Sequence, residues 1–119
     1  MDEYLVVLIF VVLVFFSVGM SISNNPREHN SFYGYRTQAS KRNQDTWDEA
    51  NMYAGKCIMG CCILIIACLI ATNLITNNVF TLLKTLLFST ILSIGLIVLL
   101  TESRLKQVFY RDGKRRPNR

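Results

Sequence analysis

The residue types that could do chemistry are concentrated in one polar segment, residues 30–55, with the sequence NSFYGYRTQASKRNQDTWDEANMYAG. Arg36 carries a planar guanidinium with five donors, which suits a carboxylate, a phosphate or the free carbonyls of a helix end. Tyr33, Tyr35 and Trp47 carry amphipathic rings that favour the headgroup level of a bilayer. The same residues are also typical of an ordinary interfacial loop with aromatic anchors and a lipid-facing arginine. On these residues alone both interpretations remain open.

The sequence offers little on which catalysis or metal binding could be built. His29 is the only histidine, and no paired acid, nucleophile or metal cluster accompanies it. Asp45, Asp48 and Glu49 are acids of the kind expected in the first turn of a helix. The cysteines all lie in one apolar stretch, where they behave as small polarizable hydrophobes; they are Cys57, Cys61, Cys62 and Cys68. We therefore expect no enzyme activity, no catalytic residue, no cofactor and no metal.

Three apolar stretches are each long enough to cross a bilayer as a helix. The first holds 19 residues without a charge, which is about 28 Å of helix. It follows Asp2 and Glu3 and not a positive segment, so we expect a retained anchor and not a signal peptide. The prediction is an all-α membrane protein with a single domain over residues 1–119, comprising spans 4–22, 53–75 and 79–101, a loop 23–52 and a basic tail 102–119.

The second helix is predicted to begin before the membrane. Asp45 or Thr46 can cap a helix, and Thr46 with Glu49 fits a capping box. No helix-breaking residue follows before the apolar run. One helix is therefore expected from about Asp45 to Thr72, about 42 Å long, with its first two turns protruding into the cytoplasm. The residues that share one face of this helix are Trp47, Asn51, Gly55 and Ile58.

The second and third spans are expected to form an antiparallel hairpin. Helices in lipid associate through small residues and interhelical hydrogen bonds, and both spans carry small residues on one face. A water or ion path lined by hydroxyls is the alternative, but neither span contains a carboxylate or a histidine that could relay protons. The predicted contact residues are Thr81, Thr85, Ser89 and Ser93 on the third span and Gly60, Ala67 and Ala71 on the second.

The positive charges predict the orientation. The loop and the tail hold eleven of the thirteen Lys and Arg residues, whereas the N-terminal segment and the Asn-rich turn near Asn77 hold none. Positive segments stay in the cytoplasm, so we expect the N-terminus outside and the loop and tail inside. Lys84, about one turn into the third span, is expected to extend outward to water. A basic tail beside a span favours anionic lipid, and not nucleic acid, as its partner.

Within the polar segment, several residues follow one spaced pattern: N-x-x-x-G-[IY]-R-T, a nearby Ser or Thr, then Trp, Asn and Gly. The residues that match are Asn30, Gly34, Tyr35, Arg36, Thr37, Ser40, Asn43, Trp47, Asn51 and Gly55. With one helix before the pattern and two after it, this arrangement resembles the SdpI family of bacterial membrane proteins and covers essentially the whole chain. These residues are the candidate motif and binding positions.

The resemblance implies a multi-pass protein of the bacterial plasma membrane that gives immunity to a secreted, membrane-active peptide toxin. It also implies a signalling role, in which a transcriptional repressor is held at the membrane once toxin is present. We expect this chain to hold the shared domain without the additional N-terminal helices of full SdpI. The alternative is a holin-like pore former, also short, three-spanning and basic at its C-terminus, although holin loops are usually brief. A small multidrug transporter would need a membrane-embedded acid, which the spans lack.

Overall fold

The computed structural model describes residues 3–24 and 35–117, and their fold is all-helical. The helices are α1 (Glu3–Asn24), α2 (Gln44–Ile75) and α3 (Val79–Val108). Each of the three is long and apolar enough to cross a membrane. The structure therefore confirms the prediction of an all-α chain with three potential membrane spans.

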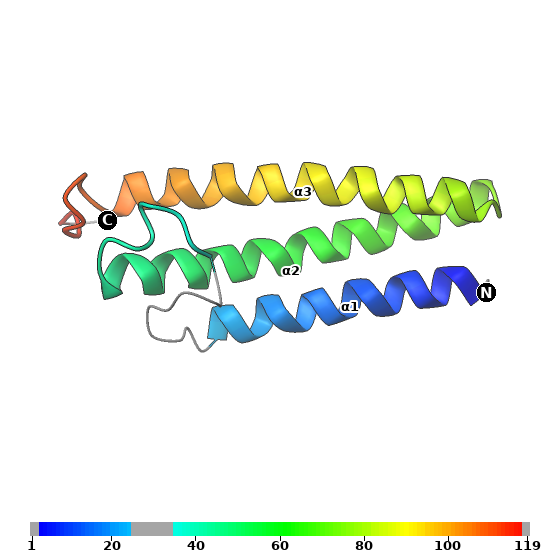
Figure 1. Cartoon of the computed structure of the whole chain (residues 1–119), viewed down its shortest axis with the longest axis horizontal. Coiled ribbons are helices and arrows are strands. Elements are labelled where there is room, and N and C mark those ends of the chain that lie inside the picture. Colours follow the sequence, from blue (N-terminus) through cyan, green and yellow to red (C-terminus); the bar gives the residue numbers. More distant parts are fainter. Residues whose placement is uncertain (1–2, 25–34, 118–119) are drawn as a thin grey trace.

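Helix α2 lies in the middle, with α1 along one side and α3 along the other (Figure 1). The N-terminus and the short α2–α3 connection lie at one end of the molecule. The C-terminal segment and the segment that leads into α2 lie at the opposite end. One apolar cluster joins all three helices; it comprises Leu5, Leu8 and Val12 of α1, Cys62, Ile65 and Leu69 of α2, and Leu82 of α3.

Helices α1 and α2 approach closely at two glycines, Gly19 and Gly55. A Cβ atom added to Gly55 would lie 2.5 Å from the Gly19 carbonyl oxygen and 2.7 Å from the backbone nitrogen of Ser23. Backbone atoms cannot move aside as a flexible side chain can, so only glycine fits at residue 55. This is the close packing through small residues that helices in lipid use.

The small residues predicted to pack against α3 lie elsewhere. A Cβ atom added to Gly60 would meet nothing within 4 Å, and Ala67 and Ala71 are exposed. The α2–α3 contact does include a hydroxyl pair, with Thr72 Oγ1 3.3 Å from Thr85 Oγ1. Two hydroxyls of the predicted stripe also bond within their own helix: Thr85 donates to the Thr81 carbonyl at 3.0 Å, and Ser89 donates to the Thr85 carbonyl at 2.6 Å.

Two helix ends differ from the prediction. The N-cap of α2 is Asn43, and neither Asp45 nor Thr46 takes this role. Helix α3 continues seven residues beyond the predicted end of the span, from Thr101 to Val108. The continuation is amphipathic, because Thr101, Leu105 and Val108 are buried at helical spacing, while Arg104 and Lys106 are exposed. An apolar stripe that packs on protein can extend a helix after the lipid-facing run has ended.

Candidate functional site

Most residues of the spaced pattern that the structure describes meet at one end of the bundle, in a structure that we call the polar cap. The cap comprises residues 35–51, from the loop and the first turns of α2, and residues 101–116, from the last turns of α3 and the segment that follows (Figure 1). Its apolar base is formed by Ala50, Leu105, Val108 and Phe109, which form a buried cluster separate from the one between the spans. The cap is thus a small folded unit at the end of the spans.

Glu102 connects α3 to the loop. Its Oε1 atom accepts hydrogen bonds from the Tyr35 hydroxyl at 2.8 Å and from the Thr37 hydroxyl at 2.6 Å. Burial, together with the hydrogen bond to the charged Glu102, raises the pKa of Tyr35 well above its usual value. The phenol therefore stays protonated and keeps donating to the carboxylate over the whole physiological pH range.

Asn51 fastens the loop backbone to α2. Its Oδ1 atom accepts from the Tyr35 backbone nitrogen at 2.6 Å, and its Nδ2 atom donates to the Trp47 carbonyl at 2.9 Å. Nδ2 also lies 3.3 Å from the Tyr35 carbonyl. Asn51 is 1% exposed, so these bonds are made away from water. An amide, which has both a donor and an acceptor, is needed because the loop offers both an N–H and a C=O.

A tight turn connects Tyr35 to the start of α2. Ser40 Oγ donates to the carbonyls of Thr37 and Tyr35, at 2.9 and 3.2 Å, and accepts from the Thr37 backbone nitrogen at 2.8 Å. Asn43 and Thr46 then form a reciprocal capping box at the helix start. The Thr46 hydroxyl also reaches back to the Ser40 carbonyl at 3.1 Å. The small polar residues of the pattern thereby satisfy the backbone of a loop that is partly buried.

The C-terminal segment folds back onto the loop. The Arg116 backbone nitrogen donates to the Val108 carbonyl and the Tyr110 nitrogen donates to the Lys114 carbonyl, both at 2.7 Å. Gly113 closes this turn with φ of +91°, a conformation that favours glycine. Its carbonyl accepts from Asn43 Nδ2 at 2.8 Å. One residue of the pattern therefore caps α2 and also fixes the tail.

Ion pairs join α2 to the other half of the cap. Arg104 Nε lies 2.9 Å from Glu49 Oε1, and Arg115 Nη2 lies 2.7 Å from Asp45 Oδ1 and 3.7 Å from Glu49 Oε2. The hydrogen bond from Arg115 to Asp45 raises the pKa of the guanidinium. Most of these groups are partly exposed, so the ion pairs add little to the free energy of folding. Their main effect is to fix the position of α2 relative to the other half of the cap.

The structure brings together most, but not all, of the predicted site residues. Tyr35, Thr37, Ser40, Asn43, Trp47 and Asn51 belong to the cap, and Gly55 lies directly below it at the contact with α1. Asn30 and Gly34 lie outside the described residues. Arg36 is exposed, and its guanidinium makes no hydrogen bond or ion pair with the residues that the structure describes. The described contacts therefore give no support to the prediction that Arg36 binds the free carbonyls of a helix end.

Glu102 and Gly113 are two residues of the cap that were not among the predicted site residues. Both lie in the segment predicted to be a basic tail. The available signal was an acid directly after the third span, which a basic tail does not require. The hydroxyl partners of Glu102 lie 65 and 67 residues earlier in the chain. No local sequence pattern could have predicted a pairing over such a separation.

Two cavities differ in their chemistry. The larger, about 550 Å³, opens in the cap and is lined by charged, aromatic and apolar groups. The smaller, about 410 Å³, lies between the spans and is lined almost wholly by apolar side chains, with Thr90 and Ser93 as its hydroxyl-bearing residues. Within the described residues, no group of three or more His, Cys, Asp or Glu side chains is placed to hold a metal ion. Of these two cavities, the one in the cap is the better suited to a charged ligand.

Comparison with known proteins gives a family but no individual relative. Residues 27–101 match the model of the SdpI/YfhL protein family. No curated protein and no solved structure matched the chain. The matched region covers more than half of the chain and includes the loop, α2 and nearly all of the apolar part of α3. The chain is a multi-pass membrane protein that belongs to the SdpI/YfhL protein family.

Proposed function

We propose that this protein acts by binding, without catalysis, to protect a bacterial plasma membrane against a membrane-active peptide toxin. Membership of the family supports this role. The chemistry of the cap supports binding over catalysis, because the hydroxyls and amides of Thr37, Ser40, Asn43 and Asn51 are used in holding the loop to the helices. Groups that are committed to the fold in this way position a surface and do not transfer protons to a substrate.

The proposed orientation places the polar cap in the cytoplasm and the N-terminus outside. Among the described residues, nine of the eleven Lys and Arg residues lie in the cap, and the other two are Lys56 in α2 and Lys84 in α3, while the α2–α3 connection at the other end is uncharged. The positive-inside rule then assigns the cap to the cytoplasm. In this orientation the cap is the part of the chain that a soluble repressor can reach, which is how the protein would signal that toxin is present.

A protection assay tests the proposal. Toxin-sensitive bacteria expressing the full chain are exposed to a panel of secreted, membrane-active peptides, and depolarisation is followed with a potential-sensitive dye. The proposal predicts that the wild-type chain delays depolarisation by at least one of these peptides. Asn51→Ala, which leaves the Tyr35 backbone nitrogen without its acceptor, should lose this protection. The control Asp48→Ala, which removes only an exposed hydrogen bond with Gln44, should keep it.

Other outcomes would contradict the proposal. Normal sensitivity to every peptide, despite verified insertion of the protein, would remove the immunity role. Abrupt lysis on expression without any peptide would instead indicate a holin-like pore.

Capture of a repressor by the wild-type chain and not by Asn51→Ala would support the signalling role of the cap.

A further inference from the structure

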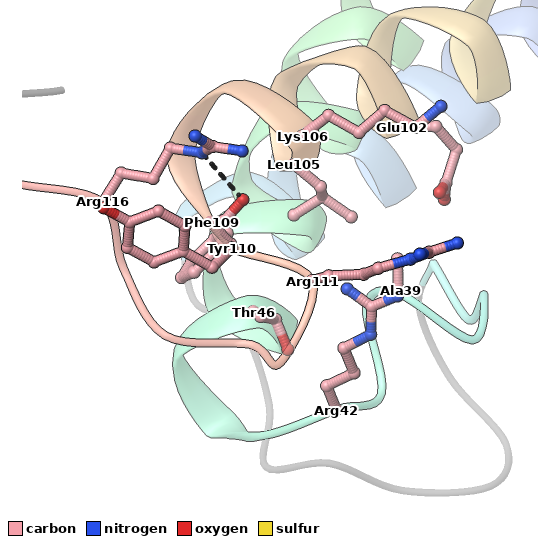
Figure 2. Close-up of a pocket in the computed structure, with 10 residues that line it drawn as sticks. All are labelled: Ala39, Arg42, Thr46, Glu102, Leu105, Lys106, Phe109, Tyr110, Arg111 and Arg116. Atoms are coloured by element: carbon pink, nitrogen blue, oxygen red, sulfur yellow. Dashed lines mark hydrogen bonds between the residues drawn. The ribbon is translucent and has the colours of Figure 1, made fainter.

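The cavity in the polar cap collects positive charge from three separate segments. Arg42 comes from the loop, Lys106 from the last turns of α3, and Arg111 and Arg116 from the segment after it. Figure 2 shows Arg42 and Arg111 extending into the same part of the cavity, with the carboxylate of Glu102 above them. Four cations with one carboxylate give the cavity a strongly positive field.

Unlike Arg104 and Arg115, these four cations have no acidic partner among the described residues. Asp45 and Glu49 form ion pairs with Arg115 and Arg104, neither of which lines the cavity. Among the residues that the structure describes, none of the four cavity cations forms an ion pair. Glu102 is the carboxylate of the cavity lining, and its Oε1 atom already accepts from two hydroxyls. The acids of the cap thus neutralise Arg104 and Arg115, whereas the four cavity cations remain available to an external anion.

Part of the cavity is held in place before any ligand arrives. Arg116 Nε donates to the Phe109 carbonyl at 3.1 Å (Figure 2), and its guanidinium lies over the Tyr110 ring at 4.7 Å from the centroid. A guanidinium fixed through Nε and one face can still present its terminal nitrogens to an anion. Such pre-ordering lowers the entropy cost of binding.

The dimensions and the position of the cavity indicate the class of ligand. Arginine forks match phosphate oxygens in geometry. A volume of about 550 Å³ exceeds that of a bare phosphate ion, and Leu105 and Phe109 supply an apolar part of the wall. Glu102 directly follows the uncharged run of α3, so the cavity lies at the level where lipid headgroups meet the hydrocarbon.

We propose that this cavity is a binding site for a phosphoryl anion, carried by an acidic phospholipid headgroup or by a soluble phosphate compound. The site does not depend on the toxin role, and either could hold without the other. Arg42 and Arg111 are the residues that we assign to the phosphoryl group. Both are exposed and unpaired among the described residues, so their removal should leave the fold intact.

Ligand binding to the purified full chain tests the site. Trp47, the only tryptophan, is buried in the cap, and its fluorescence during heating reports the stability of the cap. The probes are inorganic phosphate, water-soluble short-chain phosphatidylglycerol, and short-chain phosphatidylcholine as the zwitterionic control. The proposal predicts that phosphate or phosphatidylglycerol raises the melting temperature in a saturable manner. Stabilisation by phosphatidylglycerol alone indicates a lipid headgroup, and stabilisation by phosphate as well indicates a soluble ligand.

Matched double variants separate the site from general surface charge. Arg42→Gln with Arg111→Gln removes two cavity cations, and Lys41→Gln with Lys114→Gln removes two exposed cations that do not line the cavity. The cavity variant should bind at least ten-fold more weakly with an unchanged melting temperature in the absence of ligand. The control should bind within about two-fold of wild type. Equal losses in both variants, or no saturable binding of either anionic probe, would overturn the assignment.

Discussion

Glu102 has an unusual environment for a carboxylate at the end of a membrane span. It accepts hydrogen bonds from two hydroxyls of a loop that lies far away in the sequence. These bonds hold the loop against the end of α3 and so help to form the folded cap. Hydrogen bonds to a charged acceptor are stronger than those between neutral groups. At this scale the sequence predicted the loop residues, but it could not predict their partner, because the pairing depends on how α3 lies against α2.

Replacing Glu102 should destabilise the cap. Glu102→Ala leaves the hydroxyls of Tyr35 and Thr37 without their acceptor, and we expect a loss of about 1–3 kcal/mol. Glu102→Gln keeps an oxygen acceptor without the charge and should fall between the alanine variant and wild type. The measurement is unfolding of the purified protein in mixed micelles, followed by Trp47 fluorescence.

Asp48→Ala is the control for this series. Asp48 accepts from Gln44 in an exposed pair, and such a surface pair contributes less than about 0.5 kcal/mol. If Glu102→Ala proved as stable as Asp48→Ala, the hydrogen bonds to Glu102 would not be holding the loop.

The raised pKa of Tyr35 makes a prediction at alkaline pH. Below about pH 10 both the folded and the unfolded chain hold the phenolic proton. Above that value the unfolded chain releases its proton while the folded chain retains it, so the folded state loses the stabilisation that Tyr35 provides as the pH rises. Wild-type stability should therefore fall more steeply than that of Tyr35→Phe between about pH 10 and 11. Parallel pH profiles for the two proteins would contradict the raised pKa.

At the scale of the helices, the spans were predictable because length and uninterrupted hydrophobicity alone define them. The contacts between the spans were not. Gly60, Ala67 and Ala71 have the composition of a packing face, yet Gly55 and Gly19 make the close approach. Small residues favour a contact without specifying the partner. The end of α3 was also missed, because the apolar stripe through Leu105 and Val108 packs on the cap and not on lipid.

Two glycines of α2 provide a matched test of this packing. Gly55→Ala would place a methyl group against backbone atoms of α1 at 2.5 and 2.7 Å, and we expect a loss of about 1–3 kcal/mol from the overpacked contact. Gly60→Ala would enter open space and should be neutral or stabilising by up to about 1 kcal/mol, because alanine favours helix. Unfolding in mixed micelles measures both variants. The same effect in both would mean that α1 does not pack against residue 55.

At the scale of the molecule, the chain divides into an apolar part that fits a bilayer and a polar cap at one end. Its longest dimension is 51 Å, whereas the hydrocarbon core of a bilayer is about 30 Å thick. The excess length is the cap, in which the loop, the start of α2 and the end of α3 meet. The segregation of apolar from charged residues predicted this division, while the folding of the tail onto the loop depended on pairs too distant in sequence to predict.

The position of the cap relative to the membrane is tested most directly by cysteine labelling in intact cells. The four native cysteines are replaced by alanine or serine, with Trp47 fluorescence as the check on folding. A single cysteine is then introduced at Lys41→Cys in the cap or at Asn77→Cys in the α2–α3 connection, both at exposed residues. A membrane-impermeant maleimide should label Asn77→Cys in intact cells and Lys41→Cys only after permeabilisation. Labelling of Lys41→Cys from outside, with Asn77→Cys protected, would contradict a cytoplasmic cap.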